Sequence, residues 1–369
     1  MRVIITGGGT GGHIYPAMAI AKGLVSRHLD MEVLYVGTRE GMEAKLVPES
    51  GLVFKGISGK GLPRTFSINT IKTAGSNMKA LWEAKQVLKE FRPDLVIGTG
   101  GYVSGPVVVT AAFFGIPTLL HEQNALPGIT NKLLSRVVKG VMLTFPESEA
   151  YFPVKDKTTV VGLPVREEVG KINRKEAAAE FGLSPYQRTI LVTGGSRGAL
   201  SINTAWLDVL QKLNDHPDIQ MIWATGSATY QHMLDEMKKK GIHREKENWR
   251  VLEYIHNIPQ ALACTDLCIC RAGATTLAEL SAAGKASILI PYPYAAENHQ
   301  EYNAKAFADQ GAAFMILDKE LDRLILWENI ERIIFNTFKL EEMSARAKTV
   351  FEPGALDRII SLCLQTAWR

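Results

Sequence analysis

The sequence contains few cysteines, no long apolar segment and no Asp-x-Asp motif. Its four cysteines lack the spacing of a metal site, so we expect buried, reduced thiols in a cytosolic protein. The most apolar stretch, residues 106–120, is interrupted by Thr110, Gly115 and Pro117 and is shorter than the roughly 20 residues of a membrane-spanning helix. The first residues enter an apolar strand and not a basic, then apolar, export signal. We therefore expect no membrane-spanning segment, no secretory signal and no metal site.

The composition is that of a folded, soluble protein whose charge is unevenly distributed. Hydrophobic residues make up 46% and charged residues 22% of the 369 residues, a length that suits two domains. Residues 1–160 contain 18 Lys/Arg and 12 Asp/Glu, whereas the remainder contains 24 and 26. The basic first half predicts an anionic partner, either a phosphate-bearing substrate or a lipid surface. We expect no nucleic-acid partner.

Two glycine-rich stretches each follow an apolar strand. Residues 6–13 read Thr-Gly-Gly-Gly-Thr-Gly-Gly-His, and an apolar-periodic run comes after them. The pattern predicts a strand, a glycine turn and a helix start, whose backbone N–H groups suit an anion, and its spacing also satisfies the dinucleotide fingerprint. Residues 193–199 repeat the arrangement. Two such loops in one chain predict two domains of the same kind.

The second predicted strand lacks the acid that a dinucleotide-binding domain carries near its end for the ribose hydroxyls. The chain has Gly37, Thr38 and Arg39 at this place. Arg39 could bind a 2′-phosphate, but the missing acid argues against a nicotinamide cofactor.

Strands and helices alternate along both halves, which predicts α/β domains with mostly parallel sheets covered on both faces. In the first half we expect strands at 32–37, 52–55, 94–97 and 117–120, and helices at 42–49, at 68–91 and after Gly105-Pro106. A boundary falls near residues 144–172, where the strands stop and prolines appear. In the second half we expect strands at 189–192, 220–224, 249–252, 267–270 and 286–290, helices at 174–181, 199–213 and 230–240, and a final helical tail.

Polar residues follow the predicted strands of both halves. In the first half they are His13, the glycine-rich turn 98–105 and the cluster 121–124. A single histidine after a loop is more often a helix cap or a surface residue, but the carboxyl ends of parallel strands meet in one crevice. In the second half, Ser196 and Arg166 suit a phosphate, Glu279 at a helix start suits a ribose, and Gln300 and Asn303 share a helical face that suits sugar hydroxyls. Together these predict a nucleotide-sugar site.

Seven motifs occur in an order that resembles the MurG-type glycosyltransferases of bacterial peptidoglycan synthesis, a group within glycosyltransferase family 28. They are GGGTGGH at 7–13, GTGGYVSGP at 98–106, HEQN at 121–124, VGLPVR at 161–166, GGSRGA at 194–199, RAGATTLAE at 271–279 and NHQEYNA at 298–304. The resemblance implies the GT-B architecture, in which two Rossmann-like, doubly wound parallel-sheet domains face each other across a cleft and the C-terminal helix crosses back to the first. It implies an acceptor-binding, membrane-associating domain at 1–160, a donor domain at 161–345 and a helical tail at 346–369.

The same resemblance implies an inverting transfer of N-acetylglucosamine (GlcNAc) from UDP-GlcNAc to the 4-hydroxyl of the N-acetylmuramic acid (MurNAc) in lipid I, giving lipid II. The enzyme would be a peripheral protein at the cytoplasmic face of the cell membrane. UDP-GlcNAc would be a substrate, and we expect no cofactor. The other partners would be the polyprenyl-pyrophosphate-linked MurNAc-peptide, an anionic membrane surface and cell-wall or division proteins.

The resemblance also assigns residues to the two substrates. The donor contacts would be Arg166, Ser196, Ile255 through its backbone, Ala274, Thr275, Glu279, Gln300 and Asn303, with Thr10, Gly11, Gly12 and Asn124 on the sugar side. The acceptor pyrophosphate would lie at Gly9, Thr10, Tyr102 and Ser104. Relatives that read Gln-Gln in the last motif have His299-Gln300 here, which leaves open which of the two holds the hexose.

Direct displacement needs a base for the acceptor hydroxyl and stabilisation of the leaving UDP. We hypothesise that His13 is the base, because its reference pKa near 6.5 suits neutral pH, and His121 with Glu122 is the rival pair. The leaving pyrophosphate would lie at the second glycine loop, beside Ser196 and Arg166.

Residues 60–92 combine seven Lys/Arg and two Asp/Glu with apolar residues that include Phe66, Ile71 and Trp82. They predict either a membrane-surface patch or an ordinary amphipathic helix with a solvated basic face. Two other classes of protein remain open, a UDP-GlcNAc epimerase on the same scaffold and a non-catalytic nucleotide-binding protein.

Overall fold

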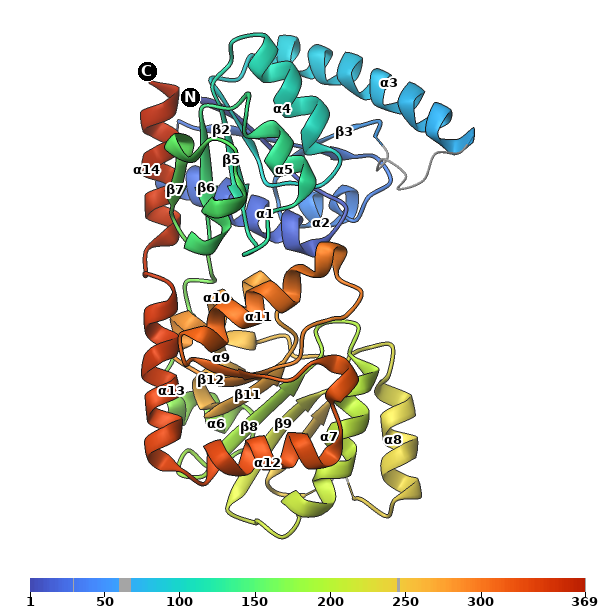
Figure 1. Cartoon of the computed structure of the whole chain (residues 1–369), viewed down its shortest axis with the longest axis vertical. Helices are drawn as coiled ribbons and strands as arrows, with labels where there is room; N and C mark the ends of the chain where they lie inside the picture. Colours follow the sequence, from blue (N-terminus) through green and yellow to red (C-terminus); the bar gives the residue numbers. More distant parts are fainter. Residues whose placement is uncertain (29, 60–67, 244–245, 369) are drawn as a thin grey trace. The chain divides into compact units, whose positions relative to one another are not determined.

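The computed structural model describes residues 1–28, 30–59, 68–243 and 246–368, without the side chains of residues 68–77. The chain forms two compact units (Figure 1). The first unit contains Met1–Pro164 and Pro353–Arg369, and the second contains Val165–Glu352. The sequence placed these divisions at 160/161 and 345/346, and the latter position lies inside helix α13 (Thr337–Val350).

The first unit is built on a seven-stranded parallel sheet. Its strands lie in the order β3-β2-β1-β4-β5-β6-β7. They are β1 (Arg2–Thr6), β2 (Glu32–Thr38), β3 (Val53–Ile57), β4 (Leu95–Gly98), β5 (Thr118–Glu122), β6 (Gly140–Leu143) and β7 (Thr158–Val160). The connecting helices are α1 (Gly11–Arg27), α2 (Glu43–Glu49), α3 (Ile68–Phe91), α4 (Ser104–Phe113) and α5 (Ile129–Leu134), with 3₁₀ turns η1 (Pro146–Tyr151) and η2 (Lys155–Lys157).

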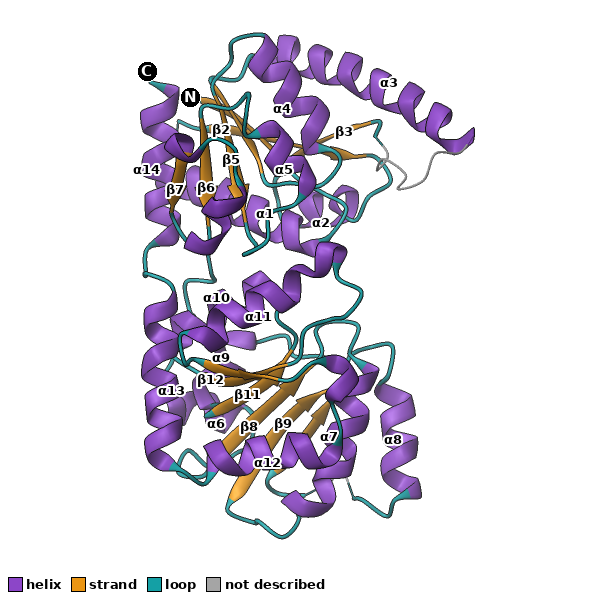
Figure 2. Cartoon of the chain, viewed as in Figure 1, coloured by secondary structure: helices purple, strands orange, loops and turns teal. Residues whose placement is uncertain are grey.

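Both faces of this sheet are covered, as the near-continuous apolar runs of its strands predict (Figure 2). Along β1, Val3 and Ile5 pack with α1 and α14 (Ala355–Ala367), whereas Ile4 packs on the opposite face with α3 and α4. This alternation is the two-residue period of a strand. The predictions of this strand and of the bounds of α3 from the sequence are confirmed.

The second unit repeats the architecture with a six-stranded parallel sheet in the order β10-β9-β8-β11-β12-β13. Its strands are β8 (Arg188–Thr193), β9 (Ile219–Ala224), β10 (Trp249–Leu252), β11 (Leu267–Cys270), β12 (Ala286–Leu289) and β13 (Ala313–Met315). Its helices are α6 (Arg174–Glu180), α7 (Leu200–Leu213), α8 (Tyr230–Lys239), α9 (Ile258–Cys264), α10 (Ala274–Ala283), α11 (His299–Asp309), α12 (Arg323–Ile334) and α13, with 3₁₀ turns η3 (Ala296–Asn298) and η4 (Asp318–Glu320). Helices α7, α8 and α12 close one apolar core on this sheet.

The strand orders explain where the two glycine loops lie. In each sheet the chain changes direction beside a central strand, at β1/β4 in the first unit and at β8/β11 in the second. Ligands of doubly wound sheets bind outside the carboxyl ends of the strands at such a switch point. The first glycine loop follows β1 and the second follows β8, so each glycine loop lies at the switch point of its own sheet.

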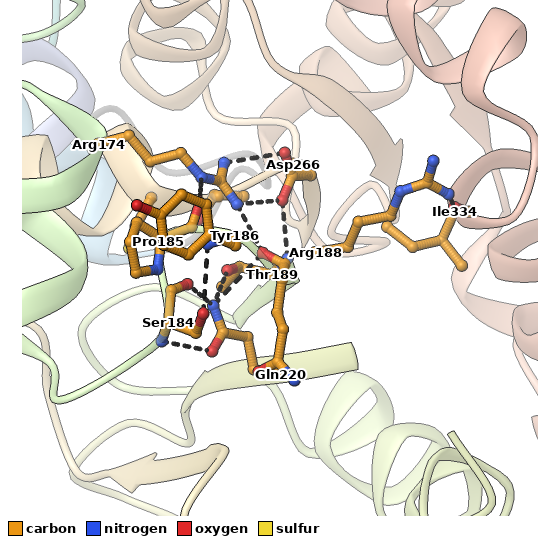
Figure 3. Close-up of polar contacts among 12 residues, drawn as sticks. Arg174, Ser184, Pro185, Tyr186, Arg188, Thr189, Gln220, Asp266 and Ile334 are labelled. Carbon is orange, nitrogen blue, oxygen red and sulfur yellow. Dashed lines mark hydrogen bonds and ion pairs between the residues drawn. The ribbon is translucent and has the colours of Figure 1, made fainter. Parts of the chain in front are cut away.

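A polar network ties together the opposite, amino-terminal edge of the second sheet (Figure 3). Asp266, just before β11, accepts two hydrogen bonds from the Arg174 guanidinium, at 2.9 and 2.7 Å, and one from the Thr189 backbone N–H at 2.8 Å. The Gln220 amide bridges Ser184 and Thr189 in the same region. These groups satisfy one another's hydrogen-bonding capacity. They lie at the amino ends of the strands, whereas the second glycine loop lies at the carboxyl ends, so the network is structural.

Several predicted boundaries were wrong. Strand β5 ends at Glu122 and not at 120, which places His121 and Glu122 inside the sheet. Helix α4 begins at Ser104, before Gly105-Pro106. The sequence also missed the short strands β6 and β7, which lie within or just before the region where the strands were expected to stop. Strands β6 and β7 have only four and three residues, which is too few for a periodic pattern to distinguish a strand from a loop.

The C-terminal helix α14 belongs to the core of the first unit. Its Ile359, Ile360 and Cys363 are buried with α1 and the sheet, and the Arg358 guanidinium donates to the Val161 carbonyl at 3.1 and 3.0 Å. None of the helices in the described part of the chain combines the length and the apolar character of a membrane span.

Replacing Ile359 with Ala should destabilise the first unit, because the change empties space in a fully buried core. We expect the free energy of unfolding to fall by about 2–5 kcal/mol, measured by denaturant titration. The exposed Gln365→Ala on the same helix is the control and should change it by less than about 0.5 kcal/mol. Equal effects of the two changes would contradict the assigned packing of α14.

Candidate active-site residues

The first glycine loop packs directly on the loop that follows β4. A Cβ at Gly7 would overlap the Thr99 hydroxyl, and one at Gly101, whose φ is +81°, would overlap the Gly8 carbonyl. The Thr99 hydroxyl donates to the His13 carbonyl at 2.9 Å. The glycines are therefore required by close backbone approach, which brings two of the predicted polar clusters together.

His13 lies at the start of α1 and is partly exposed. Its ring lies against the loop that follows β4. Its Nδ1 lies 3.3 Å from the Gly8 carbonyl oxygen and 3.3 Å from the Thr10 hydroxyl. A Cβ added at Gly100 would lie 3.0 Å from His13 Nε2. A carbonyl can only accept, so we assign the proton to Nδ1, which makes Nε2 the basic nitrogen of the neutral ring. This is the tautomer that a general base requires.

The structure contradicts the prediction of His121 as the rival base. Its side chain is completely buried at the end of β5. Its Nε2 donates to the Gly162 carbonyl at 3.0 Å, and its Nδ1 accepts from the Gln123 side-chain amide at 3.1 Å. Burial lowers the pKa of His121 to about 4, although the Gly162 carbonyl opposes this effect. A ring with both nitrogens engaged inside the sheet cannot reach a substrate hydroxyl.

Glu122 is equally buried, and its carboxylate organises the loop that follows. It accepts from the backbone N–H of Asn124 at 3.0 Å and of Gly128 at 3.2 Å, and from the Asn131 side chain at 2.9 Å. Burial raises the pKa of Glu122, and these hydrogen bonds oppose the rise. Glu122 therefore holds Asn124 in place at the strand end, and it is not a partner for an exposed base.

The predicted pyrophosphate residues divide into exposed and engaged groups. Gly9 and Thr10 are exposed, and the Tyr102 ring lies against Gly9. The Gly9 N–H, however, donates to the Glu43 carboxylate at 3.2 Å, so this amide is not available to a phosphate. Ser104 is completely buried and donates to the Gly101 carbonyl at 2.8 Å, which corrects its assignment as an acceptor contact. Of the remaining loop positions, Gly12 is exposed and Gly11 partly exposed at the start of α1.

The second glycine loop leaves Ser196 exposed after β8. Gly195 and Gly198 have φ values of +87° and +83°. A Cβ at Gly198 would overlap the Thr225 carbonyl after β9, so the loop is pressed against its neighbour. The helix α7 begins two residues later and directs its amino end toward this loop, an arrangement suited to an anion.

Asn203 holds the segment against which this loop packs, and sequence reasoning missed it. It is fully buried in α7, and its amide donates to the Thr225 carbonyl at 2.7 Å and to the Thr229 hydroxyl at 2.9 Å. Its carbonyl accepts from the Trp223 indole at 3.0 Å. Burial is decided by packing, and the residue pattern of α7 alone does not mark Asn203 as buried.

Arg166 and Glu279 meet, as the prediction of one donor site requires. Arg166 Nε lies 3.6 Å from Glu279 Oε1, and the Arg166 side chain is half exposed. Burial raises the pKa of Glu279, and the Arg166 charge opposes the rise. Glu279 lies in the second turn of α10 and not at its start, where the sequence placed it. Its carboxylate meets Arg166.

Gln300 is oriented by the chain before it. Its side-chain carbonyl accepts from the Tyr292 N–H at 3.0 Å, so its NH₂ group is the end that can donate to a sugar. His299 turns back, with Nδ1 2.8 Å from the Ala296 carbonyl. Asn303 is fully buried and donates to the Ala272 carbonyl at 3.2 Å, which joins α11 to the turn before α10. Gln300 is thus better placed than His299 or Asn303 for a hexose.

The other predicted donor positions differ in the burial of their side chains. Ile255 and Ala274 have buried side chains, whereas Thr275 is partly exposed in the first turn of α10. Nearby, the sequence missed the role of Arg271, which donates to the Ile290 and Pro291 carbonyls at 3.2 and 3.1 Å and pairs with Asp318. Arg271 therefore fixes the segment that carries the Tyr292 N–H.

Other sequence hypotheses concern a nucleotide phosphate, a membrane and a metal. Arg39 pairs with Glu83 of α3 at 3.0 Å, so it is engaged within the first unit. Trp82 is 60% exposed on α3 beside the exposed Met78. Phe66 and the side chain of Ile71 lie outside the described residues. Within the described part of the chain, no three His, Cys, Asp or Glu side chains gather as metal ligands would.

Two doubly wound parallel sheets, each with a glycine loop at its switch point, are typical of the GT-B glycosyltransferases. The chain belongs to glycosyltransferase family 28: residues 3–143 match the family's N-terminal domain and residues 189–359 its C-terminal domain. A relative from Desulfitobacterium hafniense (strain DSM 10664 / DCB-2) is 60% identical over 369 residues, the full length of both chains. It is named UDP-N-acetylglucosamine--N-acetylmuramyl-(pentapeptide) pyrophosphoryl-undecaprenol N-acetylglucosamine transferase.

More distant relatives agree with this assignment. A protein of the same name from Bacillus subtilis (strain 168) is 44% identical over 98% of both chains. The crystal structure of Acinetobacter baumannii MurG is similar over 99% of both chains, with a TM-score of 0.80 and 30% identity. A UDP-GlcNAc 2-epimerase from Neisseria meningitidis has a TM-score of 0.67 but only 15% identity over 99% of this chain and 100% of its own, so it shares the fold alone.

The buried His121 should make stability depend on pH. Its pKa is about 4 in the folded protein and about 6.5 when unfolded, so the unfolded chain binds the proton first as the pH falls. We expect stability to be lost between about pH 6.5 and 4, by roughly 3 kcal/mol in total, with no further loss from this residue below pH 4. Denaturant titration from pH 7 to 4 of the protein and of His121→Gln measures the difference. A variant that keeps the full pH dependence would contradict this assignment.

Proposed function

We propose that this protein transfers GlcNAc from UDP-GlcNAc to the 4-hydroxyl of MurNAc in undecaprenyl-pyrophosphoryl-MurNAc-pentapeptide, converting lipid I to lipid II. The observation that carries the proposal is the 60% identity, over the full length of both chains, to a relative named for this transfer. The two glycine loops and the polar side chains around them support it, because they supply a base in one unit and groups for a nucleotide sugar in the other. The 15% identity to an epimerase does not favour that alternative.

The first unit supplies the base. His13 Nε2 accepts the proton of the acceptor hydroxyl while the hydroxyl oxygen attacks C1 of GlcNAc. The bond between C1 and the β-phosphate oxygen breaks at the same time, and UDP leaves with the electron pair. Attack from the side opposite the leaving group inverts the configuration at C1.

The second unit binds the donor and stabilises the departing charge. The exposed Ser196 and the amino end of α7 bind the pyrophosphate, and Arg166 neutralises part of its charge. The Glu279 carboxylate, held near Arg166, accepts from the ribose hydroxyls. The backbone at Ile255 borders the uracil, and the Gln300 amide donates to the hexose. The proposal needs no metal ion, because these groups supply the positive potential at the leaving group.

The protein would act as a peripheral protein at the cytoplasmic face of the cell membrane. Helix α3 presents Met78, Leu81 and Trp82, which are 73%, 41% and 60% exposed, together with Lys79 and Lys85. Exposed apolar side chains flanked by lysines can insert into an anionic lipid surface, where the acceptor's polyprenyl chain is anchored.

The test of the proposed reaction is a label-transfer assay. Radiolabelled UDP-GlcNAc is incubated with polyprenyl-pyrophosphoryl-MurNAc-pentapeptide in detergent, with and without EDTA. We expect label to enter the lipid phase only when the acceptor is present, at a rate that EDTA leaves within about twofold. Isomerised donor without acceptor would instead support an epimerase, unchanged donor would support a binding protein, and loss of transfer with EDTA would overturn the metal-free mechanism.

The membrane surface has a separate test. Trp82→Asp should reduce sedimentation of the protein with vesicles of phosphatidylglycerol and phosphatidylcholine, because it removes an inserting ring and adds a repelled charge. We expect the apparent affinity to fall at least about fivefold. The control is Phe338→Asp in the second unit, where the ring is 87% exposed. Equal effects of the two changes, or no effect of Trp82→Asp, would exclude α3 as the contact.

A further inference from the structure

The carboxylate of Glu43 is buried directly beneath the first glycine loop. Glu43 is the first residue of α2 and has no exposed surface. It accepts from the Gly9 N–H at 3.2 Å and from the Thr38 N–H and hydroxyl at 3.0 and 2.6 Å. Among the described residues, no Lys, Arg or His forms an ion pair with it. Buried carboxylates are rare without a cationic partner, so this one calls for an explanation.

The surrounding backbone is shaped around this side chain. A Cβ at Gly8, Gly37 or Gly41 would overlap Glu43 atoms, so a larger residue at any of these positions would displace the Glu43 side chain. Gly37 lies near the end of β2, where dinucleotide-binding domains carry their ribose-binding acid. Here the acid, Glu43, comes six residues later, and its carboxylate is buried against the glycine loop.

The hydrogen bond to Gly9 connects Glu43 to His13 through a single peptide group. The Gly9 N–H and the Gly8 carbonyl belong to the same peptide, in which they point in opposite directions. Glu43 accepts from the N–H at 3.2 Å, and the carbonyl oxygen lies 3.3 Å from His13 Nδ1. Hydrogen bonds in such a chain polarise one another, so a negative charge on Glu43 strengthens the carbonyl as an acceptor.

We propose that Glu43 is a positioning residue for the base, acting through the Gly8–Gly9 peptide. It fixes the carbonyl that selects the Nδ1–H tautomer of His13, and it stabilises the imidazolium that forms when Nε2 takes the acceptor proton. The inference rests on the proposed function for its catalytic consequence. The tautomer and the protonation of His13 can be measured without any substrate.

Other titratable groups lie around the same loop. The Tyr35 hydroxyl donates to the Gly7 carbonyl at 2.8 Å, and burial with the Glu43 charge raises the pKa of Tyr35, so it remains neutral. The Tyr102 and Tyr15 rings border Gly9 and Gly11. Glu122 accepts from the Asn131 amide at 2.9 Å, and a Cβ at Gly100 would lie near both that amide and the His13 ring. Of these groups, Glu43 alone is connected to His13 through one peptide.

The first experiment observes His13 in the free protein. The ¹⁵N chemical shifts of labelled histidine report the tautomer and the pKa of the ring, with His13→Ala used for assignment. In Glu43→Gln, whose NH₂ group opposes one of the three donors, we expect the Nδ1–H tautomer to lose population and the pKa of His13 to fall by about half a unit or more. The control is Glu49→Gln, an exposed position of the same helix, which should change neither.

The second experiment measures transfer. Glu43→Gln should lower kcat about 10- to 100-fold and shift the acidic limb of the kcat–pH profile, with the KM for UDP-GlcNAc changed less than about threefold. In a His13→Ala background it should have little further effect, because both changes remove the same function. Glu43→Asp, which keeps the charge, should retain more activity and is the substitute if Glu43→Gln does not fold.

The outcomes separate the two proposals. An unchanged tautomer and pKa of His13 in the folded Glu43→Gln, or losses that multiply with those of His13→Ala, would overturn the role of Glu43. Failure of label transfer in the unmodified protein, with the shifts of His13 observed as expected, would overturn only the proposed function.

Discussion

Close backbone approach at the glycine loop of each unit is the constraint on which the rest of the structure depends. In the first unit, Gly7 and Gly101 bring the loops after β1 and β4 into contact, and in the second, Gly198 meets the loop after β9. No side chain larger than hydrogen fits at these points. The exposed groups of each candidate site, His13 and Ser196 among them, are carried on loops held by these contacts.

Burial divides the predicted polar residues into two groups with different tasks. His13, Ser196 and Arg166 are wholly or partly exposed, whereas His121, Glu122 and Ser104 are buried and hydrogen-bonded to the groups around them. The engaged groups hold the strand-end loops whose exposed members can meet a substrate. Glu43 and Asn203 belong with this supporting group, one beneath each glycine loop.

Much of the architecture was predictable because its signals are local. Apolar runs separated by amphipathic runs indicated two parallel-sheet domains, and the bounds of α3 were correct from periodicity alone. The meeting of Arg166 and Glu279 was also expected, since the motifs that contain them were both assigned to one donor site. The extra two residues of β5 were not, because His121 and Glu122 are polar and a strand interior is normally apolar.

The sequence by itself determined the family, the two glycine loops and the order of the strand-end motifs, since these depend on residue type and spacing along the chain. Only the tertiary structure decided which polar residues are accessible. In it, His121 and Ser104 are buried, and the Gln300 side-chain carbonyl accepts from the Tyr292 N–H. The Glu43 carboxylate accepts from the Gly8–Gly9 peptide. The physical reason is that exposure and hydrogen bonding depend on neighbours brought together from distant segments, which no local pattern contains.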